Sequence, residues 1–199
     1  MSRASVRVRP ADLGDVLGLV ELTQSVDPTS GLFSGRPLVD SGAEHLAARF
    51  GEIITESSRT LLVAVDDNAG VVGLLVARRD EIGAIDLKPV LHVSHLLVTP
   101  RFRRRGVGRA LLAAAVQVAE EWGIEHVLAT AASGSREGNR YLARLGFAPL
   151  VVNRVAPTSV LRRSLGMSDM PERMAVVRRA RLVRSSRGGL AARAVRRGA

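Results

Sequence analysis

Apolar residues along the first third of the chain change from the two-residue period of strands to the longer period of helices. Alternating valines over Ser5–Arg9 predict a short strand. Pro10 and Asp12 then open a helix that runs to about Ser25, since proline and an acid are favoured in a first helical turn. Residues 27–41 are rich in glycine and proline and predict a loop, and a second helix is expected over residues 42–57.

The middle of the chain has the pattern of consecutive strands. Thr60–Val65 and Val71–Arg78 are apolar, β-branched runs separated by turn-forming residues, which predicts a hairpin. A looser connection over residues 80–89 leads to a further strand, Val90–Val98.

The remaining pattern alternates helix and strand. Helices are predicted over Gly106–Trp122 and Ser135–Leu145, and strands over His126–Ala132 and Ala148–Val155. The resulting order is β-α-α-β-β-β-α-β-α-β. It predicts an α/β (α+β) class: a single domain whose mixed central sheet is flanked by helices.

Charge divides the chain in two. Residues 154–199 hold twelve of the 29 basic residues and only two of the 19 acidic ones, so the net charge of +10 belongs to this segment. We therefore expect a domain over residues 1–155 and an Arg-rich extension over 156–199, made of short helices or partly disordered. The extension carries no aromatic residue for base stacking, so we do not expect a nucleic-acid partner.

Composition excludes several kinds of site. The absence of cysteine rules out disulfides, thiolate zinc sites and iron–sulfur clusters, and no His/Asp/Glu group has metal-binding spacing, so no metal is expected. The N-terminus lacks the apolar segment of a signal peptide, and no apolar run is long enough to span a bilayer. A cytoplasmic protein without a membrane partner is the expectation.

The segment Leu96–Arg109 is typical of an anion site. A strand end and an arginine-rich turn precede Gly106 and Gly108, which open a periodic helix. Helix N-termini present unpaired N–H groups and partial positive charge, and glycine lets phosphates approach them. The dinucleotide fingerprint does not fit because Leu111 occupies its third glycine position, and a P-loop sequence is missing.

Two sequence motifs resemble those of the GNAT N-acetyltransferases. The run R-x-x-G-x-G at Arg103–Gly108, after a strand ending Leu-Leu-Val-Thr-Pro, resembles motif A, and Arg140–Phe147, ending Leu-Gly-Phe, resembles motif B. The resemblance covers about Ser5–Val155. It implies an acetyl-CoA-dependent N-acetyltransferase that moves an acetyl group to the primary amine of a small molecule or peptide.

The resemblance also implies residue roles toward acetyl-CoA. The Val98 amide would stabilise the oxyanion, and Ser135 or Asn139 would contact the arm near the sulfur. The pantetheine arm would bond to the main chain of Leu96, Leu97 and Val98, and the pyrophosphate would lie on Arg103, Arg104, Arg105, Gly106, Val107, Gly108 and Arg109.

Catalytic groups are less evident. The family's acidic tyrosine aligns with Leu142, and Tyr141 is one residue earlier, so its hydroxyl is expected to face elsewhere as part of a packed aromatic ring. The family's glutamate bases align with Ser94 and Thr130.

Histidines are the remaining titratable candidates on the strand before the anion site. Strand alternation predicts that His92 and His95 face opposite sides, with His92 on the side of Ser94. The catalytic candidates are therefore His92, Ser94 and Tyr141.

Other functions remain open at this stage. The family's acid and base positions hold other residues here, which is compatible with a non-catalytic acyl-CoA binder. The basic extension is compatible with a nucleic-acid-associated protein. Loop acids could attract a cationic acceptor, and a homodimer is left open. These acids are Asp27, Asp40, Asp80, Glu81 and Asp86.

Overall fold

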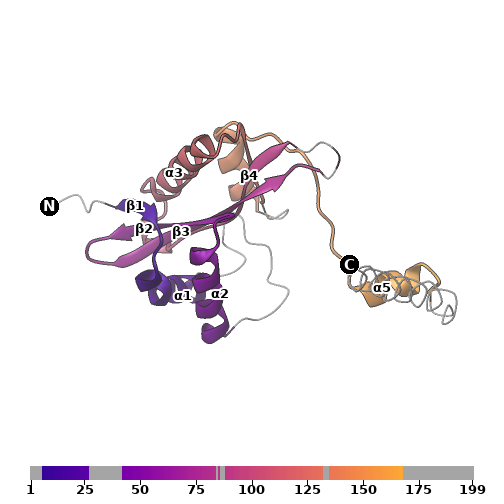
Figure 1. Cartoon of the computed structure of the whole chain (residues 1–199), viewed down its shortest axis with the longest axis horizontal. Helices are drawn as coiled ribbons and strands as arrows, with labels where there is room; N and C mark the ends of the chain where they lie inside the picture. Colours follow the sequence, from indigo (N-terminus) through magenta and orange to yellow (C-terminus); the bar gives the residue numbers. More distant parts are fainter. Residues whose placement is uncertain (1–5, 27–41, 84, 86–87, 132–134, 168–199) are drawn as a thin grey trace, which may run out of the picture. The chain divides into compact units, whose positions relative to one another are not determined.

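Five strands form one mixed sheet in a computed structural model, which describes residues 6–26, 42–83, 85, 88–131 and 135–167. The sheet order is β1-β2-β3-β4-β5, with four antiparallel strands and β5 parallel to β4 (Figure 1). This confirms the predicted α/β class with a mixed central sheet. The strands are β1 Arg7–Pro10, β2 Arg59–Asp66, β3 Gly70–Glu81, β4 Pro89–Val98 and β5 His126–Ala129.

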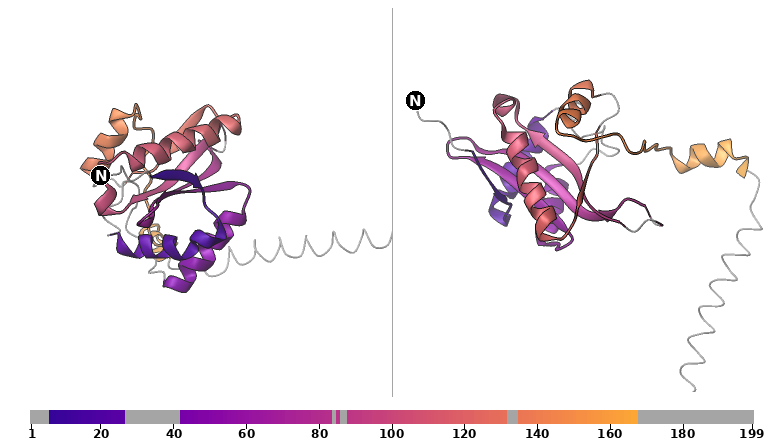
Figure 2. Two further views of the ribbon diagram at one scale, coloured as in Figure 1. Left: turned by 90° about the vertical axis from the view of Figure 1, so that its left-hand side faces the viewer. Right: turned by 90° about the horizontal axis from the view of Figure 1, so that it is seen from above.

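Helices cover both faces of this sheet (Figure 2). The short 3-10 helix η1, Leu13–Asp15, leads into α1, Val16–Ser25, which packs with α2, Ala43–Thr55, on one face. The long helix α3, Val107–Glu121, packs on the other face. Each helix therefore buries one apolar side, as its period predicts.

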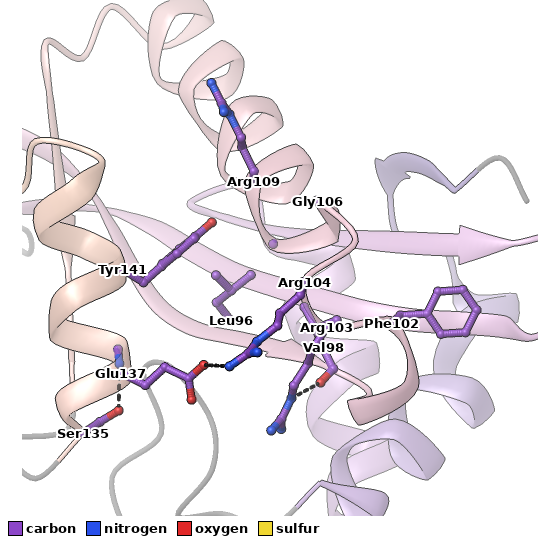
Figure 3. Close-up of a pocket in the computed structure, with 12 residues that line it drawn as sticks. Leu96, Val98, Phe102, Arg103, Arg104, Gly106, Arg109, Ser135, Glu137 and Tyr141 are labelled. Atoms are coloured by element: carbon purple, nitrogen blue, oxygen red, sulfur yellow. Dashed lines mark hydrogen bonds and ion pairs between the residues drawn. The ribbon is translucent and has the colours of Figure 1, made fainter. Parts of the chain in front are cut away.

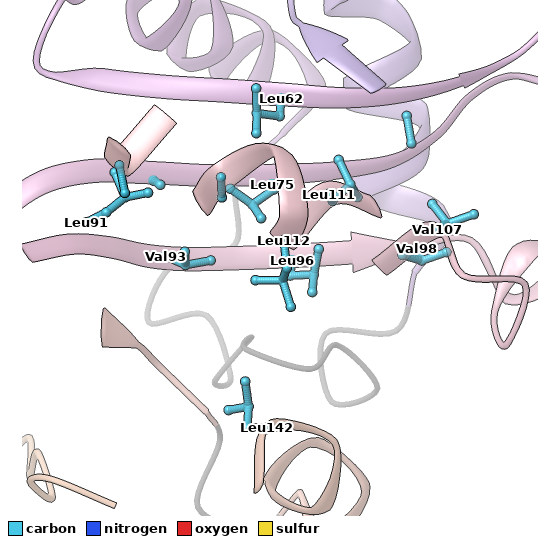
Figure 4. Packing of buried hydrophobic residues seen from close by; sticks show 14 of the residues in the cluster. Leu62, Leu75, Leu91, Val93, Leu96, Val98, Val107, Leu111, Leu112 and Leu142 are labelled. Carbon is cyan, nitrogen blue, oxygen red and sulfur yellow. The ribbon is translucent and has the colours of Figure 1, made fainter. Parts of the chain in front are cut away.

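Two apolar clusters mark the two faces. On the α3 face, Leu96 of β4 packs with Leu111 of α3 (Figure 4). On the opposite face, Leu97 packs with the residues of α1 and α2. Leu111 is 0 % exposed, so its truncation to alanine should cost about 2–5 kcal/mol of stability. The clusters hold β4 rigidly from both sides.

The predicted helices and strands are present near their expected positions except at the end of the domain, and the loop expected over residues 27–41 lies outside the described residues. The expected strand Ala148–Val155 is wrong: these residues form no strand, and Val151, Val152 and Val155 are exposed. Apolar alternation alone favoured a strand, but a strand needs a hydrogen-bonded neighbour, and none pairs with this segment among the described residues.

The chain divides into two compact units, residues 1–149 and 150–199. In the second unit, the expected short helix is present as α5, Thr158–Ser164, with exposed side chains throughout. The rest of the Arg-rich extension, from residue 168, lies outside the described residues, so the predicted extension stays a prediction. No helix in the described part of the chain is long and apolar enough to cross a membrane.

Candidate active site

The turn between β4 and α3 is tightly constrained. After the 3-10 helix η2, Pro100–Phe102, both Arg104 (φ 61°) and Gly106 (φ 86°) adopt left-handed backbone conformations. Such a conformation costs about 1–2 kcal/mol for a residue with a Cβ atom, whereas glycine adopts it freely. Gly106 is the N-cap of α3 and offers no capping side chain, so the first N–H groups of α3 have no partner within the helix.

Basic side chains surround this helix start (Figure 3). Arg103, Arg104 and Arg109 line a pocket between α3, β4 and the helix α4, Arg136–Arg144. The Arg103 Nε donates to the Val98 carbonyl at 3.2 Å, and the Arg104 Nη2 lies 3.9 Å from the Glu137 Oε1. Free amides, a helix dipole and guanidinium groups together favour a pyrophosphate.

Glycine at Gly108 leaves this pocket open. A Cβ atom there would lie 3.6 Å from the Tyr141 hydroxyl and 3.9 Å from a Leu96 methyl group, both of which line the pocket. A larger side chain would therefore occupy the pocket itself. This spacing fits a ligand that reaches from the α3 start to the edge of β4.

The edge of β4 beyond the pocket is free to bind a polar ligand. β5 pairs with β4 only from Val90 to Val93, so the rest of β4 has no neighbouring strand on that side among the described residues. The Thr99 amide donates to Val72 of β3 at 3.0 Å. Because N–H directions alternate along an antiparallel ladder, the Val98 and Leu96 amides point away from β3, into the gap left by β5.

Tyr141 extends from α4 into the same pocket. Its hydroxyl is buried and has no hydrogen-bond partner among the described residues, and burial raises the pKa of this phenol. Leu142 is 6 % exposed and packs in the core instead. The expectation that the Tyr141 hydroxyl faces elsewhere is therefore wrong: the α4 axis is placed so that Tyr141, not Leu142, faces the pocket.

A β-bulge rearranges the middle of β4. The β3–β4 register passes from Val76↔His95 to Ala77↔Val93, which leaves Ser94 as an extra residue. The Ser94 hydroxyl donates to the Val76 carbonyl at 3.3 Å. Because Ser94 is an extra residue, two β4 residues that are three positions apart across it lie on the same side of the sheet. The strand therefore does not alternate regularly at this point.

Both histidines consequently lie on the α1/α2 face. Leu91 and Val93 belong to the α3-side cluster and Leu97 to the other, which places His92 and His95 together on the side of Leu97. The predicted opposite orientation is wrong because the bulge was not anticipated. The His95 side chain is exposed, but the protein atoms around it partly desolvate the imidazole, and this, together with the nearby charge of His92, lowers its pKa, so His95 is neutral at pH 7.

A chain of short polar contacts on this face links β3, β4 and the residue that follows β5. The His92 Nδ1 lies 3.2 Å from the Asp80 Oδ2, and the His92 Nε2 lies 2.6 Å from the Thr130 Oγ1. Asp80 stands near the end of β3 and also accepts from Arg78 at 2.7 Å. No sequence pattern indicated that Asp80, His92 and Thr130 meet.

Comparison with known proteins identifies the family. The family model described as the acetyltransferase (GNAT) family matches residues 29–147, more than half of the chain. The chain belongs to the GNAT acetyltransferase family. No curated protein matches it.

Solved acetyltransferases share the fold at low sequence identity. Aminoglycoside N-acetyltransferase AAC(6')-Iy in complex with CoA is 19% identical, with a TM-score of 0.65 over 79% of this chain and 97% of that chain. AAC(6')-Ih from Acinetobacter baumannii is 19% identical, with a TM-score of 0.62 over 77% and 99%. Glucosamine-6-phosphate N-acetyltransferase from Arabidopsis thaliana is 14% identical, with a TM-score of 0.60 over 77% and 99%.

Most of the cofactor residues expected from the GNAT resemblance meet in one pocket. Three further lining residues, Phe102, Glu137 and Gly138, were not anticipated, because the motif marks only the helix start. The predicted residues that line the pocket are Leu96, Val98, Arg103, Arg104, Gly106, Gly108, Arg109, Ser135 and Tyr141.

Four expected residues contribute differently. The Leu97 side chain packs under α1 and α2, and ladder alternation directs its main chain to β3, so its expected bond to the arm is not supported. Val107 is buried in the core, and Arg105 stacks 5.3 Å from the Phe102 ring centroid. The Asn139 amide donates to the Ser135 carbonyl at 2.8 Å, within α4.

The expected acceptor groups are only partly described. Asp27, Asp40 and Asp86 lie outside the described residues. Glu81 is exposed, and Asp80 is engaged by Arg78 and His92. The α1/α2 face of β3 and β4 therefore presents a histidine-centred cluster where the sequence suggested loop acids.

Proposed function

We propose that this protein is an acetyl-CoA-dependent N-acetyltransferase that moves an acetyl group to the primary amine of a small molecule or peptide. The observation that carries the proposal is the continuity of the pocket from the α3 start to the free edge of β4. One end suits a pyrophosphate, and the other suits a thioester arm that bonds to main-chain amides.

The residues in this pocket suit acetyl-CoA as co-substrate. Arg103, Arg104 and Arg109, with the first amides of α3, would hold the pyrophosphate. The Val98 amide would donate to the thioester oxygen as negative charge develops on it. A main-chain donor held in a sheet needs little rearrangement to do this.

Tyr141 suits the role of acid toward the leaving thiolate. Its unpartnered hydroxyl faces the pocket, and its raised pKa keeps the phenol protonated at neutral pH. His92 suits the role of base, because it lies beside β5 where β4 and β5 separate. Ser94 holds the bulge through its bond to Val76 and is assigned no proton transfer.

A two-step experiment tests the function. Thermal shift with acetyl-, propionyl- and succinyl-CoA measures cofactor binding, and a thiol-reactive dye then follows CoA release with a panel of amines. The chain has no cysteine, so released CoA is the only thiol in the assay. Stabilisation followed by amine-dependent thiol release is expected. If none of the three acyl-CoA compounds raises the melting temperature, the cofactor assignment is wrong.

A non-catalytic acyl-CoA binder is the second candidate. The absence of a carboxylate at Ser94 and Thr130, the positions that align with the family's glutamate bases, favours it. Such a protein would be stabilised by acetyl-CoA but release no thiol with any amine, whereas the proposed enzyme would do both. The same assay therefore separates the two functions.

A further inference from the structure

The proposed acetyl transfer assigns a role to His92 but none to its contacts with Thr130 and Asp80. We propose that these residues form a proton relay: Thr130 accepts the proton that the acceptor amine loses, His92 receives it from Thr130, and Asp80 orients His92. The proposal rests on the proposed acetyl transfer and adds two residues to it.

Thr130 stands where the relay would need to begin. Its amide donates to the Val93 carbonyl at 3.2 Å, directly after the last β5 residue that pairs with β4. The gap between the two strands therefore opens at Thr130. The Val98 and Leu96 amides point into the same gap, which is the space proposed for the thioester arm. The Thr130 hydroxyl therefore lies at the end of this space where β4 and β5 separate.

The charge of Asp80 sets the direction of the relay. Burial alone would raise the pKa of this carboxyl, but hydrogen bonds from Arg78, the Glu81 amide and His92 outweigh it, and the pKa stays below its usual value. An ionised carboxylate only accepts hydrogen bonds, so the His92 Nδ1 must carry the hydrogen. The neutral ring then leaves Nε2 as an acceptor for the Thr130 hydroxyl.

Because its hydrogen is directed to the His92 Nε2, the Thr130 oxygen can accept a proton from another group. Its hydrogen is donated to Nε2 at 2.6 Å, and its lone pairs face outward from that bond. Thr130 also occupies one of the two positions that align with the family's glutamate bases. A hydroxyl is a poor base alone, but one coupled to an imidazole passes on a proton as it receives another.

Few other ionisable groups surround His92 in the described part of the chain. Arg78 and Asp80 face it from β3, and His95 lies beyond the bulge on β4. The Arg78 charge is matched by Asp80 at 2.7 Å. His92 is largely shielded, with 17 % of its side chain exposed, whereas Thr130 is exposed.

The proton balance of the transfer is complete. The amine lone pair forms the N–C bond to the thioester carbon, and the nitrogen gives its proton to the Thr130 oxygen. The Thr130 hydrogen passes to the His92 Nε2, which becomes an imidazolium facing the Asp80 carboxylate. The C–S bond breaks, and the thiolate takes a proton from Tyr141. Solvent then returns the His92 proton to the phenolate.

Substitution of Thr130 tests the relay by activity. Thr130→Val keeps the shape of the side chain and removes the hydroxyl, so kcat should fall about 10- to 100-fold, within the usual range for losing a proton-transfer group. Thr130→Ser should restore kcat to within about twofold. The matched control is Thr60→Val on β2, which should leave kcat unchanged. Wild-type kcat in Thr130→Val would overturn the relay.

The pH profile tests the role of Asp80. Asp80→Asn should lower kcat and move the acid limb of the kcat/KM profile to lower pH, because the imidazolium loses its carboxylate partner. A merely structural Asp80 would lower activity without moving this limb, which would overturn its role. The thermal shift with acetyl-CoA should be unchanged, and this separates a failed relay from a failed cofactor assignment.

Nitrogen NMR of the imidazole tests the geometry without turnover. The relay requires the Nδ1–H tautomer of His92 in the wild type at neutral pH, and loss of the Thr130 bond in Thr130→Val. An Nε2–H tautomer would overturn the relay even if acetylation occurs. Detection of acetylated Thr130 by mass spectrometry would overturn the relay in favour of a covalent route. Absence of thiol release with every amine would overturn both the relay and the proposed function.

Discussion

The carboxyl end of β4 and its middle serve the two halves of the proposed reaction by different means. At the carboxyl end, main-chain amides and arginines from one continuous run, residues 96–109, converge on the pocket. In the middle, single side chains from β3, from β4 and from the residue that follows β5 converge on the opposite face; they are Asp80, His92 and Thr130. Binding of the common co-substrate thus depends on local backbone geometry, whereas the acceptor side depends on tertiary placement.

This difference has a consequence for mutational behaviour. Changes at the α3 start should alter CoA affinity and leave the pH dependence alone. Changes on the histidine face should alter pH dependence and leave CoA affinity alone. Substitutions in each region therefore test whether the two are independent.

The largest effect is expected from filling the pocket at Gly108. Gly108→Trp places an indole where a Cβ atom already lies 3.6 Å from Tyr141, so acetyl-CoA affinity should fall at least about 100-fold, the loss of roughly 3 kcal/mol. Thermal shift should detect no stabilisation by acetyl-CoA. Gly51→Ala on α2, where a Cβ meets nothing within 4 Å, is the control and should retain the full shift. Retained stabilisation in Gly108→Trp would place the cofactor elsewhere.

The next largest effect is expected from substituting Tyr141, which lies in the pocket and would take part in proton transfer. Tyr141→Phe should lower kcat about 10- to 100-fold by removing the acid, with little change in the KM for acetyl-CoA. The hydroxyl is buried without a partner among the described residues, so its removal should leave the free energy of unfolding equal or slightly higher. Denaturant unfolding and steady-state rates measure both. Equal kcat in the two proteins would mean that the thiolate is protonated by another group.

A smaller effect is expected from Glu137. Its carboxylate lies 3.9 Å from Arg104 at the pocket, and both side chains are exposed. Glu137→Gln removes a negative charge from the phosphate site, so CoA affinity should rise about two- to threefold at low ionic strength and return to the wild-type value at high salt. Calorimetric titration at two salt concentrations checks this. An affinity that is insensitive to salt would argue against a phosphate at this position.

The smallest effect is expected from His95, on the opposite face. Because its folded pKa is lowered, the unfolded state takes up the proton first, and stability is lost as pH falls below about 6.5. His95→Asn should therefore lose less stability than the wild type between pH 7 and pH 5. Melting temperatures at the two pH values measure the difference, and acetyl-CoA affinity at pH 7 should be unchanged. An identical loss in both proteins would show that His95 titrates normally.

Sequence patterns predicted one of these regions much better than the other. Gly106, Gly108 and the neighbouring arginines lie within a few residues of each other, and helix-start chemistry depends on such local order. The order of helices and strands along the chain, up to α4, also followed from apolar periodicity. Thr130 and Asp80 were not predicted as partners of His92, because 38 and 12 residues separate them from it and only the strand register brings them together.

Two errors have specific physical causes. The direction of the Tyr141 hydroxyl was predicted wrongly, because the orientation of a helix depends on how it packs. The one-residue offset from the family's tyrosine position did not determine how α4 is oriented. The strand expected at Ala148–Val155 satisfied an apolar pattern, but periodicity does not show whether a neighbouring strand is available.

The bulge at Ser94 makes the site sensitive to a gain in length but not to the loss of this one residue. Deleting Ser94 would join Val93 to His95 in a regular ladder, so Leu91 and Val93 would still face α3 and His92 the opposite side. Inserting one more residue before His95, with the bulge kept, would instead reverse the facing of every β4 residue before it, and His92 would turn toward the apolar cluster under α3. A gene for this strand can therefore lose the codon for Ser94 more safely than it can gain another one beside it.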